Sequence, residues 1–262
     1  MKSLWVACWA ESLKVRKSKM FWITILLFAF IASMMGVLMF VAQHPEIAEK
    51  SAVLGAKASI FKKVDWPSYF GLLNEVVALI GMIGFGFVAS WVFGREYSDR
   101  TIKDLLALPI SREIIVMAKL IIVGVWCLIL AVVLFGVGLA AGWVVKLDGW
   151  SSGAAFEEFR LFTGTAFLTI LLGGPVAFFA AWGKGYLAPM GYLILAMIVT
   201  QFVVAALPGL GAYFPWAIPA LFSGVAGAGS PQLGIISYLI LVGTSLLGAA
   251  ATLAWWKYAD QH

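Results

Sequence analysis

The sequence predicts an all-α integral membrane protein with six transmembrane helices and both termini in the cytoplasm. Of the 262 residues, 63% are hydrophobic and only 12% are charged, whereas a soluble domain carries about 25% charged residues. The apolar residues also gather in runs of about 20, the length that spans the hydrocarbon core of a bilayer. A water-soluble globular fold is therefore excluded, and we expect residues 1–262 to form one transmembrane domain.

Six apolar runs define the expected spans. No charged residue falls between Lys19 and Glu46, and this first run is longer than the core of a signal peptide, so we expect it to stay as a span. The fourth run contains Gly-Gly-Pro at 173–175, which predicts a kink. From Gly185 to Trp256 there is no charged residue, a length that suits two spans. The expected spans are about 20–42, 69–93, 114–145, 160–182, 187–207 and 235–256.

Two segments outside the spans also have a predicted structure. Residues 1–19 place Trp5 and Trp9 on one side and basic residues at the end, which predicts an amphipathic helix in the inner membrane interface. A longer first span with a ragged start is the alternative. The connector from Leu207 to Pro231 is rich in Gly and Pro yet apolar. It predicts a re-entrant hairpin whose irregular backbone is buried in protein or lipid headgroups.

The distribution of Lys and Arg predicts the orientation. Cytoplasmic loops of membrane proteins are enriched in these residues. With the N-terminus inside, twelve of the 18 Lys and Arg residues fall on the cytoplasmic side and six fall outside. Four of these six lie in a first outer loop of about 43–68. The net charge of +5 is therefore attributed to orientation and anionic lipid, and no nucleic-acid binding is expected. The six outer residues are Lys50, Lys57, Lys62, Lys63, Lys146 and Arg160.

Enzymatic chemistry has no good candidate residues. The two histidines, His44 and His262, lie outside the spans and far apart, so no histidine-based metal or catalytic site is expected. Intramembrane serine proteases have Gly two residues before the catalytic Ser, whereas this chain has Leu221 at that distance before Ser223. No histidine in a later span can act as the base of Ser223. The Gly-Lys-Gly sequence at 183–185 lacks the spacing and the following Ser or Thr of a phosphate loop. We expect no ATP hydrolysis by this chain alone.

One segment, between the second and third spans, is strongly charged. Opposite charges recur there at a spacing of four residues, which favours a helix, beside an apolar stripe at helical spacing. Pro109 ends this helix, and Ser111 can cap the next one. A short amphipathic helix, about 95–108, is expected to protrude into the cytoplasm, although a plain interfacial linker would show the same periodicity. The charge pairs are Glu96/Arg100, Asp99/Lys103 and Arg100/Asp104, and the stripe is Ile102, Leu105 and Leu106.

This segment resembles the cytoplasmic loop of type-2 ATP-binding-cassette permeases, the membrane subunits of bacitracin, lantibiotic-immunity and drug-efflux transporters. The shared pattern is an acidic residue, Thr, Lys, a pair of Leu, then Pro-Ile-Ser-Arg and a later Lys. The sequence departs at Arg100, where the family usually has Gly. The six spans, the interfacial helix and the re-entrant element resemble the family more weakly. The matching residues are Glu96, Thr101, Lys103, Leu105, Leu106, 109–112 and Lys119.

The resemblance implies the permease subunit of an exporter, with no cofactor of its own. It implies pairing with a second permease copy or paralogue, and with separate ATPase subunits that hold ATP and magnesium. The helix between the second and third spans would dock on the ATPase as a coupling helix, with Glu96 in a desolvated charge pair across that interface. The substrate would leave the cytoplasm or the inner leaflet. The implied docking residues are Arg95, Glu96, Tyr97, Asp99, Arg100, Thr101, Ile102, Lys103, Asp104, Leu105 and Leu106.

Two other function classes stay open from the sequence. One is a membrane scaffold or regulatory subunit with no transport path. The other is an ion-coupled secondary carrier, which needs ionisable residues near the membrane midplane. Such residues are scarce here, because Glu75 and Lys119 lie near the ends of their spans. If the coupling role does not belong to the segment at 95–108, the short loop around Lys184 is the next candidate.

Overall fold

A computed structural model describes residues 2–44, 46, 63–107, 109–224 and 231–258, and over these residues the chain is helical with no strand. The first outer loop, expected over about 43–68, lies largely outside the described residues. The helices are α1 (Lys2–Arg16), α2 (Lys19–Gln43), α5 (Trp66–Ser98), α6 (Ile102–Leu106), α7 (Arg112–Val145), α8 (Ser152–Leu171), α9 (Gly173–Trp182), α10 (Leu187–Ala206), α11 (Pro208–Gly211), α12 (Ile218–Phe222) and α13 (Ile235–Tyr258).

Six membrane-capable segments are present, which confirms the predicted number of spans. They are α2, α5, α7, the α8–α9 pair, α10 and α13. Five of them are longer than predicted, and the largest extensions are in α5, which continues to Ser98, and in the fourth span, which begins at Ser152. The apolar pattern marks the part of a helix that is compatible with hydrocarbon, whereas the helix itself continues into its polar flanks.

Side-chain caps set where three of these helices begin. Ser18, Asp65 and Ser111 precede α2, α5 and α7, and the side chain of each accepts a hydrogen bond from a backbone N–H in the first turn. These N–H groups have no partner within the helix, so the caps satisfy them. The cap by Ser111 was predicted from the sequence and is confirmed.

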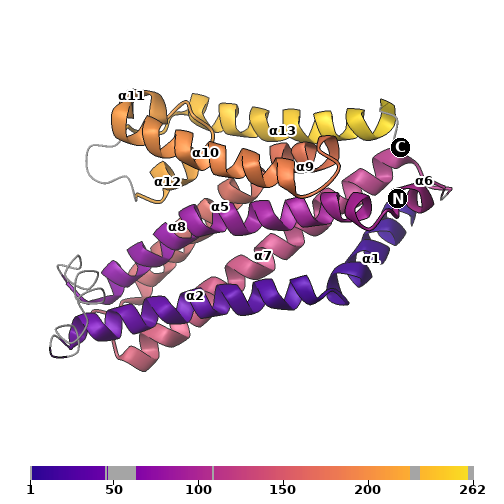
Figure 1. Ribbon diagram of the computed structural model, residues 1–262. Coiled ribbons are helices and arrows are strands. Elements are labelled where there is room, and N and C mark those ends of the chain that lie inside the picture. The colour runs from indigo at the N-terminus through magenta and orange to yellow at the C-terminus, as the bar shows by residue number, and fades with distance from the viewer. Residues whose placement is uncertain (1, 45, 47–62, 108, 225–230, 259–262) are drawn as a thin grey trace.

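Helix α5 lies at the centre of the bundle. It packs against α7, α8 and α9, while α2 packs on α7 and α13 on α9 (Figure 1). Of the apolar window of α5, 72% is buried, compared with 28% for α2 and 22% for α10 and α13. The outer helices therefore leave wide apolar faces exposed, as is expected of surfaces that face lipid or another subunit.

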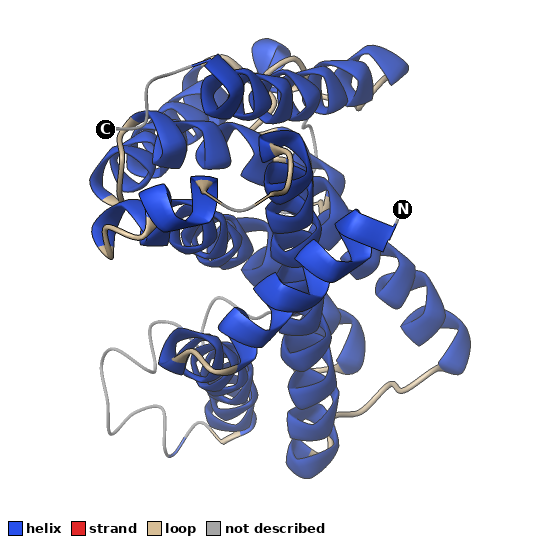
Figure 2. Ribbon diagram, turned by 90° about the vertical axis from the view of Figure 1, so that its right-hand side faces the viewer, coloured by secondary structure: helices blue, strands red, loops and turns tan. Residues whose placement is uncertain are grey.

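Both termini lie at one end of the bundle, as an even number of crossings requires. Helix α6 lies at the same end, and α11 lies at the opposite end (Figure 1). Figure 2 looks onto the end with the termini and shows α1 lying across it. Helix α1 packs on α7, and its buried residues Ala7, Glu11 and Val15 recur every four positions, while Trp5 and Trp9 are 70% and 55% exposed. It is therefore a separate helix, not a ragged start of α2.

The predicted kink in the fourth span is also present. Pro175 has no N–H, so the carbonyl oxygen of Leu171 loses its helical donor, and the hydroxyl of Ser245 in α13 donates to that oxygen at 2.6 Å. Glycines allow this approach: a Cβ on Gly174 would lie 2.5 Å from the Ser245 carbonyl oxygen, and one on Gly248 would collide with the backbone of Pro175. The kink thus fits α9 closely against α13.

The connector between α10 and α13 packs on the bundle through its apolar residues. Helix α12 lies against α8 and α5. Trp216, Ile218 and Leu221 are buried, and the Trp216 indole N–H donates to the Tyr192 hydroxyl of α10 at 3.2 Å. Residues 225–230 of the connector lie outside the described part. Packing on the bundle accounts for the apolar residues at 216–221, whereas Leu207, Leu210 and Tyr213 stay 44%, 55% and 53% exposed.

Candidate functional site: the α6 end of the bundle

The charged segment folds as two helices separated by a turn, which corrects the single helix predicted over about 95–108. At this turn Arg100 takes a left-handed backbone conformation, with φ of 58°. Its N–H donates to the Tyr97 carbonyl at 3.2 Å, and the N–H of Thr101 donates to the Glu96 carbonyl at 2.9 Å. These two bonds form a Schellman motif, which ends α5. Helix α6 then has only five residues.

The turn explains why the family pattern usually has Gly at the position that Arg100 occupies here. A left-handed conformation costs an ordinary residue roughly 1–2 kcal/mol, and glycine adopts it freely. Arg100 therefore occupies a glycine position and adopts the conformation a glycine would. Since the turn takes α5 and α6 out of one helical register, none of the three predicted charge pairs forms an ion pair within the described ranges.

The predicted docking residues lie in different environments. Glu96 and Ile102 are buried inside the chain, at 2% and 5% exposure. Leu106 lies in the last turn of α6. The remaining residues are partly buried or exposed, so most of the segment is available to a partner. Arg95, Tyr97 and Leu105 are half-buried, and Asp99, Arg100, Thr101, Lys103 and Asp104 are exposed.

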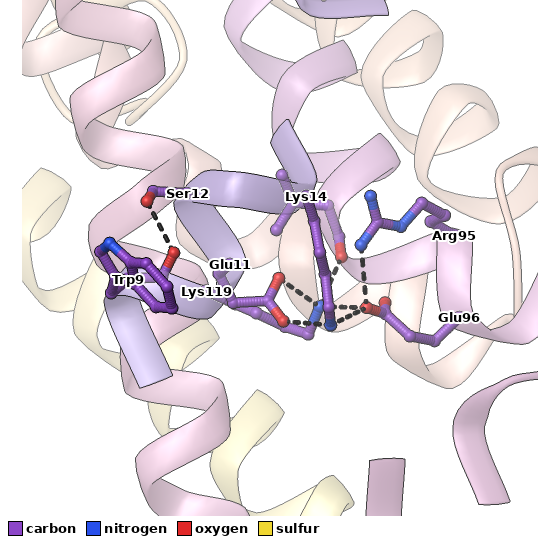
Figure 3. Close-up of polar contacts among 8 residues, drawn as sticks. Trp9, Glu11, Ser12, Lys14, Arg95, Glu96 and Lys119 are labelled. Carbon is purple, nitrogen blue, oxygen red and sulfur yellow. Dashed lines mark hydrogen bonds and ion pairs between the residues drawn. The ribbon is translucent and has the colours of Figure 1, made fainter. Parts of the chain in front are cut away.

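Glu96 belongs to a buried charge cluster formed by α1, α5 and α7 (Figure 3). The ammonium group of Lys119, in α7, lies 2.7 Å from Glu96 Oε1 and 3.2 Å from Glu11 Oε2 of α1. It also donates to the carbonyl oxygen of Val92 at 3.0 Å. Lys119 is 0% exposed and Glu11 only 5%. In this chain Glu96 is therefore paired internally, and only 2% of it is exposed.

Two more cations complete the charge cluster. Lys14 lies 2.6 Å from Glu11 Oε1 and 3.6 Å from Glu96 Oε1, and Arg95 lies 3.4 Å from the same Glu96 oxygen. Burial raises the pKa of Glu11, but the ammonium groups of Lys119 and Lys14 outweigh burial and hold the pKa below its ordinary value. Glu11 is therefore ionised at neutral pH. The cluster ties α1, α5 and α7 together directly beside α6.

Sequence reasoning missed this cluster, although two signals were present. Lys119 lies within an apolar run, and Glu11 lies four residues from both Ala7 and Val15, on one face of a helix. Ionisable residues in apolar surroundings are expensive unless they are paired. The identity of the partners was hidden because Glu11 and Lys119 are 108 positions apart in the chain.

Helix α6 stands between two surface grooves of different charge. The first, of about 550 Å³, is lined by Lys14 and Arg95 and by three carboxylates, those of Glu96, Asp99 and Asp104. We call it the mixed groove. The second, of about 490 Å³, contains no carboxylate, and we call it the basic groove. It is lined by Tyr97, Arg100, Ile102, Lys103 and Lys184.

The basic groove brings the loop at 183–186 next to α6, so the two candidate coupling segments of the sequence form one surface. Neither groove offers a metal site: within the described part of the chain, no group of three or more His, Cys, Asp or Glu side chains could hold a metal ion. The arrangement offers charged docking contacts at the end of a membrane bundle.

Comparisons with known proteins agree with this architecture. Residues 7–203 match the family model of the ABC-2 family transporter protein. The bacitracin transport permease protein BCRB of Bacillus licheniformis is 30% identical over 188 residues, which cover 71% of this chain and 88% of that protein. Membrane subunits of this family are not catalytic, and their ATPase is a separate subunit. The chain therefore belongs to the ABC-2 transporter family and is a multi-pass membrane permease of an ATP-binding-cassette transporter.

Proposed function

We propose that this chain is the permease subunit of an exporter, that it pairs with a second six-span chain, identical or paralogous, and that separate ATPase subunits holding ATP and magnesium dock at α6. The observation that supports this most directly is the row of exposed polar residues at the α5–α6 turn and on α6. These residues lie at the bundle end that also carries both termini (Figure 1). Exposed polar residues of this kind add little to the stability of a bundle. Binding of a partner subunit therefore explains their presence better than a role in stability does.

The buried residues of the same segment have a complementary role. Ile102 packs in the core of the bundle, and Glu96 is held by Lys119. A force applied to α6 by an ATPase is therefore passed to α5 and α7, and not absorbed by a loose loop. Leu105, half-buried and packed against the core, lies at the edge of the docking surface.

The proposed orientation places α6, the N-terminus and the C-terminus in the cytoplasm. Cysteine scanning in a background without Cys8 and Cys127 tests this orientation. An impermeant thiol reagent added to intact cells should label a cysteine at Lys57 and spare one at Lys103 or Lys257. Labelling at position 103 from outside would reverse the orientation.

Two membrane placements follow from the same orientation. Helix α1, with Trp5 and Trp9 exposed, would lie in the inner interface, where the ring of tryptophan is favoured. The α11–α12 connector, packed on α8 and α5, would form a re-entrant hairpin in the outer half of the membrane. The exposed apolar faces of α2, α10 and α13 are available to lipid and to the second permease.

Transport can be tested with a defined cargo. The relative BCRB is named as a bacitracin transport permease, so bacitracin is the first compound to test on this chain. Cells that express the chain with its ATPase should tolerate more bacitracin than cells that express either protein alone. The proposed direction is out of the cytoplasm or the inner leaflet, and accumulation of labelled cargo inside cells would contradict it.

The central experiment reconstitutes the chain in nanodiscs with candidate ATP-binding-cassette ATPases from the same genome. The chain alone should hydrolyse no ATP, and a cognate ATPase should bind it and hydrolyse ATP faster in its presence. Association without any stimulation or transport would favour a scaffold or regulatory subunit. Hydrolysis by the chain alone, with contaminants excluded, would contradict the proposal.

A further inference from the structure

Three cations meet at the basic groove from two separate loops. Arg100 and Lys103 come from the α5–α6 turn and α6, and Lys184 comes from the loop between α9 and α10. All three are exposed, and none makes an ion pair within the ranges that the structure describes. Like charges gathered in a groove that no carboxylate lines repel one another and attract anions. The groove is therefore suited to an anionic partner.

The two loops that build this groove are held in place. A Cβ on Gly94, in the last turns of α5, would lie 2.9 Å from the carbonyl oxygen of Gly185, so the two backbones are in direct contact. The side chains of Ser98 and Tyr186 also hydrogen-bond. The backbone positions that carry the three cations are thus set before any partner arrives, which reduces the entropic cost of binding.

A helix end alone does not account for these cations. Arg100 and Lys184 both follow a helix C-terminus with left-handed φ of 58° and 50°. The helix dipole favours a cation at such a place by about 0.3–1 kcal/mol, whereas the left-handed conformation costs a side chain roughly 1–2 kcal/mol. Glycine would therefore be the more stable choice at both positions, and the positive charges call for another reason.

The charges on the two sides of α6 indicate what kind of partner fits. The basic groove lies on one side, and Asp99 and Asp104 line the mixed groove on the other. An anionic bilayer presents a single sign of charge and would be repelled by the two aspartates. A folded protein can present acidic residues to one side and basic residues to the other, which matches both grooves.

We propose that the basic groove receives an acidic segment of the ATPase subunit, with Asp or Glu side chains pairing with Arg100, Lys103 and Lys184. The inference rests on the proposed function, and it adds the loop at Lys184 to the docking surface and the sign of charge on the partner. The ATPase then contacts two cytoplasmic loops at once. A movement of the ATPase is passed through α6 to α5 and through Lys184 to α9 and α10.

Zero-length cross-linking tests the chemistry of the contact. A carbodiimide joins a lysine amine directly to a carboxylate that it touches. In the complex of the whole chain with its ATPase in nanodiscs, we expect cross-linked peptides that join Lys103 or Lys184 to Asp or Glu residues of the ATPase. A stable complex that yields no link from either lysine would overturn the inference. Failure of every candidate ATPase to bind the wild-type chain would instead contradict the proposed function.

Charge reversal gives a second readout with a matched control. Lys184→Glu should weaken ATPase binding at least about tenfold, and Lys103→Glu/Lys184→Glu should weaken it further. Lys146 also follows a helix end with left-handed φ, of 57°, and the 34 residues of α7 separate it from the turn after α6, so Lys146→Glu should leave ATPase affinity unchanged. Unchanged affinity in the double variant would overturn the inference. So would a defect seen with phosphatidylglycerol and absent in pure phosphatidylcholine, because the groove would then bind lipid.

Discussion

Replacing Lys119 by Met tests the buried charge cluster most directly. Methionine has a similar length and no charge, so the change removes the ammonium group with little change in volume. Glu96 loses its contact at 2.7 Å and Glu11 its contact at 3.2 Å. Both carboxylates are almost fully buried. Glu96 Oε2 has no hydrogen-bond partner within the described residues even before the change, so the loss leaves that carboxylate poorly compensated.

The expected cost follows from this geometry. Removing one partner of a buried ion pair costs about 3–5 kcal/mol, because the other charge stays buried without compensation. Lys14 and Arg95 still approach the two carboxylates, so we expect a loss near the lower end, about 3 kcal/mol. Lys103→Met is the matched control. Since Lys103 is exposed and makes no ion pair within the described ranges, its replacement should change stability by less than about 0.5 kcal/mol.

Thermal unfolding in nanodiscs measures the difference. In a background without Cys8, a thiol-reactive dye reports unfolding, because the remaining cysteine, Cys127, is only 1% exposed in the folded chain. The triple variant Lys119→Met/Glu11→Gln/Glu96→Gln should recover much of the stability, because it leaves no buried charge uncompensated. A single Lys119→Met variant as stable as the wild type would refute the reasoning. So would a triple variant that is no more stable than the single one.

Three further outcomes are expected. Ser245→Ala leaves the Leu171 carbonyl without its donor and should lower stability by about 1 kcal/mol in thermal unfolding; no loss would mean that the carbonyl is satisfied otherwise. Arg100→Gly should raise stability by about 1 kcal/mol, because glycine accepts the left-handed conformation, while ATPase affinity falls; a rise in affinity would contradict the docking role. The lowered pKa of Glu11 means that its ion pairs stabilise α1 at neutral pH and are lost as pH falls through that pKa. In a background without Cys8 and Cys127, a fluorophore on Ala10→Cys should report release of α1 in acid, and Glu11→Gln should abolish this transition.

The charge cluster and the two grooves have different roles at the α6 end. The grooves present charges to a partner, whereas the cluster fastens the segment below α6 to α1 and α7. For this reason Glu96→Ala and a change of Lys103 should differ in kind. The first disturbs the folded chain around α1, and the second affects only association with the ATPase.

Several features could be predicted from the sequence because their causes are local. Apolar runs of sufficient length give the six spans, since the bilayer tolerates no other surface. The hydroxyl of Ser111 caps α7 and Pro175 breaks the fourth span, each through its own neighbours in the chain. The family was also recognisable from a local pattern, residues 96–112 with the later Lys119.

Tertiary structure decided the details of the site, because they depend on residues far apart in the chain. The sequence indicates that Lys119 needs a partner, but helix packing alone places Glu11, 108 positions away, within 3.2 Å of it. The turn at Arg100 also escaped prediction, since charge pairs at a spacing of four favour a continuous helix and burial of Ile102 overrides them. The position of Lys184 beside α6 follows from the contact of Gly94 with Gly185. Charge pattern along a chain shows where charges are, and only packing shows which of them meet.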